Sequence, residues 1–267
     1  MTSSRGFRLG AALALALLLG FLTLPLLSLF VEAGPAELIA SLGEQGAADA
    51  LWLSLRTSLA ALAIIVVVGT PAAYLIARRR FRGRSVVITM IELPLVLPPA
   101  AAGIALLAAF GPNGLIGGAI EDAGIRLVLE TAGVVVALTF VAAPFFVRGA
   151  IAAFEALDSS LLEASRTLGA GEARTFGRVA IPTARVGLAS GLALAWGRAL
   201  GEFGATLMFA GSLQGRTQTA PLAIFEFLSR DFDSALALSA VLLVTSAFIL
   251  LSVKLLGGRA EGADAHG

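Results

Sequence analysis

Few side chains in the apolar part of this 267-residue chain could do chemistry. Glu92, Arg198 and Glu202 fall within long apolar runs, and Arg56 falls near the end of another. The chain has no cysteine, and its single histidine, His266, lies in a polar tail. Because thiolate and imidazole groups supply most nucleophiles, general bases and zinc ligands, we expect neither a catalytic site nor a metal site in this chain.

The sequence also shows no motif that would couple the chain to an energy source. The chain has one lysine, Lys254, which a nucleotide-binding phosphate loop would need. It stands in LLSVKLLGG, which is not a glycine-rich loop followed by Ser or Thr. We therefore expect no ATPase activity in this chain and do not expect it to be an enzyme. No series of acids or histidines threads the apolar runs as a proton relay would. If the chain takes part in an energy-driven process, the energy must come from another chain or from an ion gradient. An ion-coupled secondary transporter or a channel stays open, although no inverted repeat with paired broken helices is evident.

The elements that must position these few charges are membrane helices. Mean hydropathy is +0.92, 58% of the residues are hydrophobic and 14% are charged. Apolar runs of about 20 residues can cross a hydrocarbon core of about 30 Å. We therefore predict an all-α polytopic membrane protein with six transmembrane helices, over about 9–30, 54–77, 86–110, 131–152, 183–211 and 234–257. The first run is too long for the apolar region of a cleaved signal peptide, so we predict a helix there.

Basic residues fix the predicted orientation. With the N-terminus inside, 14 of the 19 basic residues fall in cytoplasmic segments: Arg5, Arg8, Arg78, Arg79, Arg80, Arg82, Arg84, Arg148, Arg166, Arg174, Arg178, Arg185, Lys254 and Arg259. Only Arg126, Arg216 and Arg230 fall in outside loops. Positive residues concentrate on the cytoplasmic side of a membrane protein. We therefore expect both termini in the cytoplasm, and nothing in the charge pattern suggests a nucleic-acid partner.

The longest polar stretch, within a predicted cytoplasmic loop at 153–182, has the signals of two short helices. Asp158 and the following serines can cap the first helix. Gly169 and Gly171 then break it, and a second short helix ends before Pro182. One interpretation is an amphipathic helix lying on the cytoplasmic leaflet. The other is a docking helix for a partner.

The spacing within this loop resembles the EAA loop of ATP-binding-cassette (ABC) importer permeases. That pattern is Glu-Ala-Ala, three residues, Gly, nine residues and Ile-x-Leu-Pro. This chain carries it, with small or aliphatic replacements, at Glu163, Ala164, Ser165, Gly169, Val179, Ile181 and Pro182. The resemblance implies that these residues couple the permease to a cytoplasmic ATPase, which a helix from the loop contacts.

A narrower resemblance comes from GRALGEFGATLMFAG followed by GRTQTAPLAIF, which look like molybdate permeases of the molybdate, sulfate and tungstate importer group. It implies a type I importer (MetI-like) permease fold in a bacterial inner membrane. It also implies a second copy of this chain, an ABC ATPase dimer that binds ATP and Mg, and an external oxyanion-binding protein. No cofactor is expected in this chain, and a sulfate or tungstate permease stays open.

Two patterns in the fifth predicted span concern the pathway. Gly187 and Gly191 stand four apart, as do Gly197 and Gly201, which leaves one helix face nearly bare. Such a face can pack within one subunit or against a second subunit.

Arg198 and Glu202 are also four apart and can pair on one face. They can hold helices in register, or they can form part of a translocation pathway or gate with Phe203 and Thr206.

Two further expectations concern single residues and the C-terminus. Glu92 lies near the cytoplasmic end of its predicted span, so the arginines at 78–84 are candidate partners and a functional role is not expected. Residues 1–257 are predicted to form one transmembrane domain, and 258–267 a disordered tail.

Overall fold

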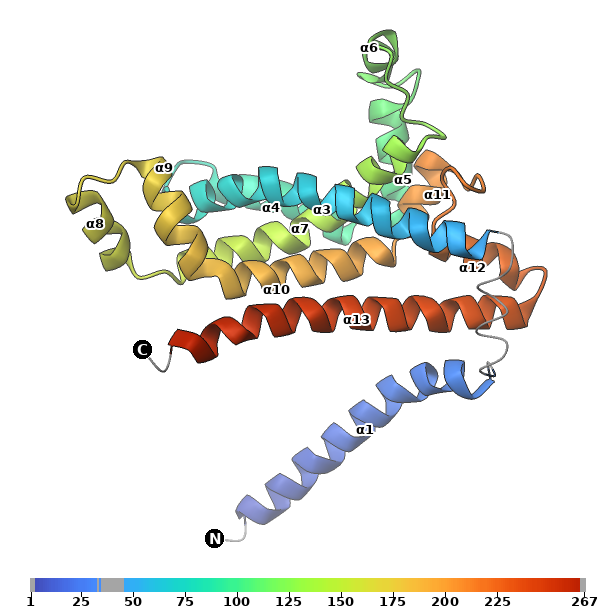
Figure 1. The fold of residues 1–267 in the computed structure, drawn as a ribbon, viewed down its shortest axis with the longest axis horizontal. Helices are drawn as coiled ribbons and strands as arrows, with labels where there is room; N and C mark the ends of the chain where they lie inside the picture. The colour runs from blue at the N-terminus through green and yellow to red at the C-terminus, as the bar shows by residue number, and fades with distance from the viewer. Residues whose placement is uncertain (1–2, 33, 35–45, 265–267) are drawn as a thin grey trace.

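Every regular element of the described chain is helical, as the sequence predicts (Figure 1). The computed structural model describes residues 3–32, 34 and 46–264, with side chains for 6–32, 34 and 46–253. The last three residues of the predicted tail, which include His266, lie outside these ranges. The elements are α1 (Ser3–Glu32), α3 (Ala47–Arg78), α4 (Arg84–Val96), α5 (Pro99–Phe110), α6 (Gly117–Asp122), α7 (Thr131–Glu155), α8 (Ser159–Thr167), α9 (Glu172–Thr175), a π-helix (Phe176–Ala180), α10 (Ile181–Leu200), α11 (Gly204–Ala210), α12 (Ala220–Leu228) and α13 (Phe232–Asp264).

Five helices of the described chain are long and apolar enough to span a membrane, and a sixth span is counted if α4 and α5 are taken together. The axes of α4 and α5 differ by 117°, so the span predicted over 86–110 is a sharply bent pair of helices and not one continuous helix. Leu97 and Pro98 adopt extended backbone between the two helices. Each of them precedes a proline, which disfavours the helical conformation.

The predicted span over 183–211 is also broken. Helix α10 ends at Leu200, and α11 begins only at Gly204. Phe203 between them has φ −124° and ψ −59°, outside helical geometry. Gly201 and Gly204 flank the break, and glycine is a poor helix former.

The predicted ends of two other spans differ from the structure. Helix α3 begins at Ala47 rather than at 54. Helix α13 continues to Asp264, into the segment predicted to be a disordered tail. Alanine, glutamate and arginine in that segment are good helix formers, which a prediction based on polarity does not weigh.

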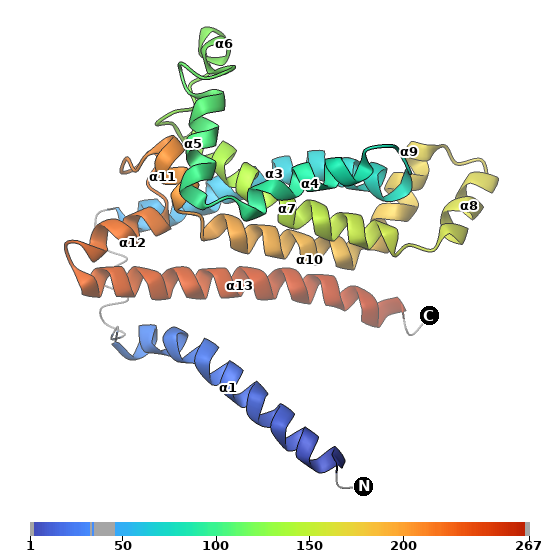
Figure 2. The same ribbon diagram turned by 180° about the vertical axis from the view of Figure 1, so that it is seen from behind.

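Helices α3, α7 and α10 pack side by side in the centre of the bundle, with α13 against α10 (Figures 1 and 2). Phe146 and Phe154 of α7 are buried in this core. Gly69 of α3 faces Phe146 and Val147 so closely that a Cβ atom there would lie 3.1 Å from Val147. By contrast, α1 contacts only α13 to any extent, and no residue of its membrane-spanning part is buried. The central helices therefore form the scaffold on which the polar elements are mounted.

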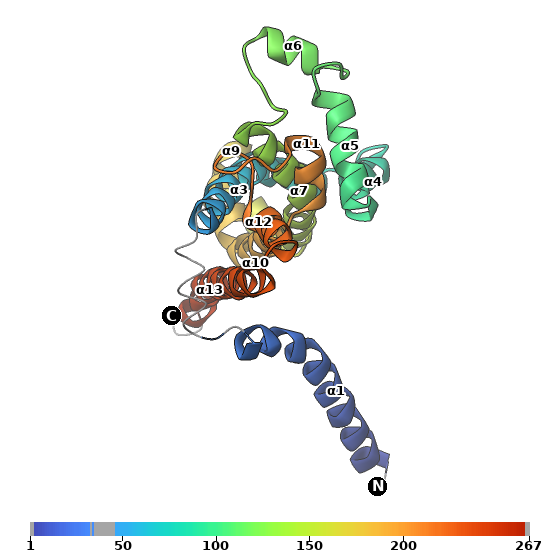
Figure 3. The ribbon, with the colours of Figure 1, turned by 90° about the vertical axis from the view of Figure 1, so that its right-hand side faces the viewer.

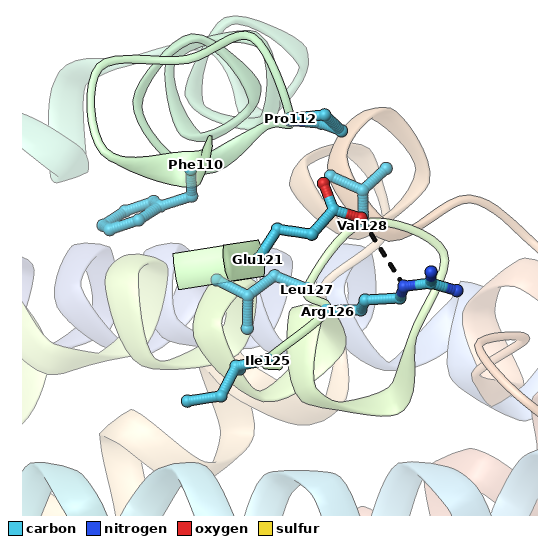
Figure 4. A pocket seen from close by; sticks show the side chains of 8 residues that line it. Phe110, Pro112, Glu121, Ile125, Arg126, Leu127 and Val128 are labelled. Atoms are coloured by element: carbon cyan, nitrogen blue, oxygen red, sulfur yellow. Dashed lines mark ion pairs between the residues drawn. The ribbon is translucent and has the colours of Figure 1, made fainter. Parts of the chain in front are cut away.

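Helix α5 leaves this bundle steeply and carries α6 at its tip (Figures 1 and 2). A small cavity of about 50 Å³ lies where the chain returns from α6 towards α7, between Phe110, Leu127 and Val128 (Figure 4). Arg126 pairs with Glu121 at 3.5 Å on its wall. The cavity lining therefore carries one acidic and one basic side chain, which pair with each other.

Candidate coupling loop and translocation site

The polar loop folds at one end of the bundle, where α8 stands apart from the spanning helices (Figure 1). Asp158 caps its first turn, because the carboxylate accepts a hydrogen bond of 2.9 Å from the Ser160 backbone N–H. That hydrogen bond holds the pKa of the Asp158 carboxyl below its ordinary value. Leu162 is buried and anchors α8 to the core.

The end of α8 is set by Gly169, which has a positive φ of 80°. The Gly169 N–H donates to the Arg166 carbonyl at 2.9 Å, and the Ala170 N–H donates to the Ser165 carbonyl at 3.1 Å. This is the Schellman motif, in which a left-handed residue lets the chain turn back and satisfy the last helical carbonyls. The sequence prediction of a glycine-dependent turn at this position agrees with this geometry.

Between cap and turn, α8 presents a surface of small and charged residues. Glu163 and Ala164 are exposed, whereas the Ser165 hydroxyl lies 3.0 Å from the Thr175 hydroxyl of α9. Leu168, just past α8, is 88% exposed. Leu161 of α8 is also exposed, at 47%, so this surface carries two apolar side chains beside its small and charged ones.

The second half of the EAA spacing lies at the start of α10. Val179 and Ile181 are partly buried against the main core, whereas Pro182 is exposed in the first turn of α10. The short helix predicted to end before Pro182 instead continues, because residues 172–200 form one helical run with π-helix geometry at Phe176–Ala180. Proline removes one hydrogen bond from such a run, and the π-helix stands directly before it. The Thr183 hydroxyl donates to the Val179 carbonyl at 2.7 Å and so satisfies one carbonyl near the junction.

Three aromatic rings join this loop to the spanning helices. Phe176 of the π-helix lies 4.8 Å from Tyr74 of α3, and Phe154 of α7 lies 5.2 Å from Tyr74, measured between ring centroids. The loop is therefore packed onto two helices that reach the opposite end of the bundle.

Removing the α8 cap is expected to loosen the coupling helix without unfolding the bundle. In Asp158→Ala the Ser160 N–H loses its acceptor, so amide exchange in the first turn of α8 should speed up. Asp158→Asn is the matched control, because its amide oxygen can still accept. Since the folded pKa of Asp158 is lowered, its contribution should be present above the unfolded pKa and be lost as pH falls through the folded pKa. Hydrogen exchange followed by mass spectrometry measures both effects, and equal exchange in the two variants would contradict the assigned cap.

At the other end of α10, Glu202 occupies the break before α11. Its side chain is 1% exposed. One carboxylate oxygen accepts from the Ala205 N–H at 2.7 Å and caps the start of α11. The other lies 2.6 Å from a guanidinium nitrogen of Arg198, as a charge pair whose alignment falls outside hydrogen-bond geometry. Glu202 thus links the end of one helix to the start of the next.

The other three residues predicted for the pathway lie near this carboxylate and differ in exposure and in contacts. The Arg198 side chain is 27% exposed. Phe203 stacks at a tilt against Phe225 of α12, with centroids 5.1 Å apart. Thr206 is fully buried, and its hydroxyl has no hydrogen-bond partner among the described residues, which is unusual for a buried donor. Because the break interrupts the helix, Thr206 does not continue one straight helical face from Arg198.

Two broken segments meet at this site. A Cβ atom on Gly204 would lie 2.7 Å from Pro99, at the start of α5. A Cβ atom on Gly103 would lie 2.7 Å from the Ala205 carbonyl oxygen. Irregular backbone at membrane depth occurs where protein or an aqueous cavity covers it. The α4/α5 and α10/α11 breaks therefore pack against and cover each other.

The glycines predicted to pack do so to different extents. Gly187 approaches Ala153, and Gly191 approaches Gly149, both on α7 of the same chain. Gly197 lies beside Leu250 of α13, whereas Gly201 meets only its own helix. The observed contacts of the first three are therefore within one subunit.

Sequence reasoning missed several polar contacts beside the site. Arg216 pairs with Glu130, the latter just before α7, with one nitrogen–oxygen distance of 3.0 Å. The backbone N–H of Ala220 donates to the buried Ser54 hydroxyl of α3 at 2.7 Å. These partners stand 86 and 166 residues apart, so no local spacing could reveal them.

Comparison with known proteins agrees with this arrangement. A family described as "Binding-protein-dependent transport system inner membrane component" matches residues 66–261. The molybdenum transport system permease protein ModB of Mycobacterium tuberculosis is 41% identical over 233 residues, covering 87% of this chain and 88% of that protein. The sulfate transport system permease protein CysW of Synechocystis is 34% identical over 246 residues, covering 91% and 89%.

A solved structure shares the fold. The crystal structure of a bacterial alginate ABC transporter, in complex with an alginate pentasaccharide-bound periplasmic protein, contains a chain that superposes with a TM-score of 0.75 at 18% identity, covering 96% of both chains. The fold is that of MetI-like ABC permeases. The chain belongs to the family of binding-protein-dependent transport system inner membrane components and is a permease subunit of an ABC importer.

Proposed function

We propose that two copies of this permease form the membrane pore of an ATP-driven importer for molybdate. The observation that carries the proposal is α8, an exposed helix fixed at both ends and carrying the EAA spacing. Identity of 41% to a molybdenum permease supports the choice of molybdate. An external binding protein would capture the oxyanion, so the pore itself needs only weak contacts for it.

In this proposal the α8 end of the bundle faces the cytoplasm, and so do both termini. Arg78, Arg79, Arg84 and Arg166 gather at that end, in accord with the positive-inside rule. Glu163, Ala164 and Leu168 would contact the partner ATPase dimer, which binds ATP and Mg. We expect the permease itself to bind no cofactor.

The proposed coupling runs along α10. Closure of the ATPase dimer would move α8 and the π-helix, which pack on α3 and α7 through Phe176. Helix α10 has 20 residues and is about 30 Å long, so it reaches from the loop to the break at Glu202. We place the outer gate at Arg198, Glu202, Phe203 and Thr206, where the helix direction can change while the Glu202 cap is made or broken.

Uptake of labelled molybdate tests the proposal directly. Vesicles would hold this permease with its ATPase and its binding protein, with excess sulfate or tungstate as competitor. We expect uptake that needs ATP and resists sulfate. Uptake that sulfate abolishes would instead support a sulfate permease, to which the 34% identity with CysW points. Faster uptake of labelled tungstate than of labelled molybdate would support a tungstate permease, and ATP-independent flux would contradict the ATP-driven mechanism.

A further inference from the structure

Helix α4 is held to the bundle in an unusual way. All of α4 is described, and none of its residues is buried. Two ion pairs tie it to the antiparallel α7, Arg84 with Glu155 and Glu92 with Arg148, the second at 3.2 Å. The partner of Glu92 is thus Arg148, and not one of the arginines at 78–84 as the sequence suggested.

The Glu92–Arg148 pair lies within the predicted spans over 86–110 and 131–152 rather than at their edges, so Arg148, counted above among the cytoplasmic basic residues, belongs to a span. Glu92 is eight residues beyond Arg84, and Arg148 is seven residues before Glu155, so both lie about 11 Å from the cytoplasmic ends of their helices. Their side chains are nonetheless 33% and 60% exposed. Charged groups at this depth are costly against lipid and face protein or water instead.

The surrounding surface of α7 is not suited to lipid. Throughout Thr131–Glu155, which the structure describes in full, no large hydrophobic side chain is exposed. The exposed positions in its cytoplasmic half are Arg148, Ala152 and Glu155, spaced four and three apart on one face. A lipid-facing helix would present leucine, isoleucine or valine there.

The two edges of α4 differ in polarity. On one edge, Met90, Ile91 and Pro94 line an apolar groove of about 350 Å³ shared with α3 and α7. On the other edge, Ser85, Thr89 and Glu92 are spaced four and three apart and share one face, which is polar up to the exposed Val96 four residues beyond Glu92. Figure 3, viewed along the bundle, places α4 on one side of α7 and α10 on another. The polar edge of α4 therefore adjoins the polar face of α7.

We propose that Ser85, Thr89, Glu92, Arg148 and Ala152 line a water-filled vestibule on the cytoplasmic side, and that Arg148 is a contact site for the departing oxyanion. Guanidinium donors suit a tetrahedral oxyanion because two N–H groups can reach two oxygens. Glu92 offsets the charge of Arg148, so the anion is held weakly enough to leave, as conduction requires. The vestibule is inferred from the polar and exposed residues of α4 and α7 alone, whereas the role of Arg148 rests on the proposed oxyanion transport.

Single-cysteine labelling tests the vestibule, and the chain has no cysteine to remove. Ser85→Cys and Thr89→Cys are each matched with a neighbour at the same depth, Val86→Cys and Met90→Cys, which are exposed in the isolated chain but lie outside the polar edge. In inside-out vesicles holding the full importer, a charged, membrane-impermeant thiol reagent should label the first two at least about tenfold faster, because the thiolate reacts only where water reaches it. Equal rates within each pair, or faster labelling of the neighbours, would overturn the vestibule.

Charge-neutral variants test the role of Arg148. Arg148→Gln should lower the rate of oxyanion uptake about tenfold, the order expected for losing a charged hydrogen bond. The double variant Glu92→Gln with Arg148→Gln should stay as low, because the cation is still missing, whereas Arg148→Lys should restore part of the uptake. A merely structural pair predicts the reverse, since the double variant leaves no unpaired charge and should recover. Recovery would therefore overturn the contact site.

The outcomes of these tests distinguish a failure of the proposed function from a failure of the vestibule. If the unaltered importer takes up no oxyanion, the proposed function is wrong, and the labelling pattern still decides whether the vestibule exists. If uptake is normal and the paired positions label equally, only the vestibule is wrong.

Discussion

Replacing Gly169 with valine is expected to lower ATP-driven uptake more than tenfold while the helical bundle stays folded. Gly169 has φ +80°, and an L-residue there costs about 1–2 kcal/mol, more for a β-branched side chain. A Cβ atom at this position would meet nothing within 4 Å, so the cost is in the backbone and not in a clash. The turn that ends α8 would open and shift Leu168, which we propose contacts the ATPase. Uptake and permease-stimulated ATP hydrolysis measure the loss, and circular dichroism checks the fold.

The matched control is Gly171→Val, two residues further along the same loop. Gly171 has φ −68° and ψ 164°, which any residue adopts, and a Cβ atom there also meets nothing within 4 Å. The same side chain is added in the same loop, but no strained backbone results, so uptake should stay within about twofold of the unaltered protein. If both variants transported normally, the Gly169 turn would not be needed for coupling. If both failed equally, bulk in the loop and not the backbone turn would be the cause.

The coupling loop could be predicted in detail because its determinants are local. Asp158 caps a helix that starts at the next residue, and Gly169 supplies a left-handed residue two positions after the last residue of that helix. Both effects act over two to five residues, so residue type and spacing carry them. Helical spacing alone does not give the buried face of α8, because Leu162 is buried whereas Leu161 and Leu168 are 47% and 88% exposed. For the cap and the turn, the residue types and their spacing in the sequence are therefore enough to predict the backbone geometry.

The breaks within spans could not be predicted this way. Hydropathy sums apolar character along a window, so it joins α4 to α5 and α10 to α11 across residues that are apolar but not helical. The 117° bend at Pro98 is favoured by two prolines, but prolines also occur in kinked, continuous helices. What sets the larger angle is the packing of α5 against α11, where Gly103 and Gly204 permit close approach. The choice of Arg148 as the partner of Glu92 also depends on tertiary packing, since the two residues are far apart in the chain.

Replacing Glu202 with alanine is expected to destabilise the permease by roughly 3 kcal/mol and to abolish uptake. The side chain is 1% exposed, and its removal leaves the Ala205 N–H without an acceptor and the Arg198 guanidinium without its partner. Breaking a buried pair by removing one partner costs about 3–5 kcal/mol, and the 27% exposure of Arg198 places the expected cost at the lower end. Thermal unfolding of the purified permease in detergent measures the stability, and vesicle uptake measures the function.

Glu202→Gln separates the cap from the charge. A glutamine oxygen can still accept from the Ala205 N–H, so the start of α11 should stay capped, whereas the attraction to Arg198 falls. If the pair closes the outer gate, this variant should fold normally and leak oxyanion without ATP, and adding Arg198→Gln should not stop the leak. A pair that only holds the helices in register predicts a loss of stability that the double variant recovers, with no leak in either. The leak therefore distinguishes a gate from a brace, because a charge that merely fixes packing has no reason to control whether the pore is open at rest.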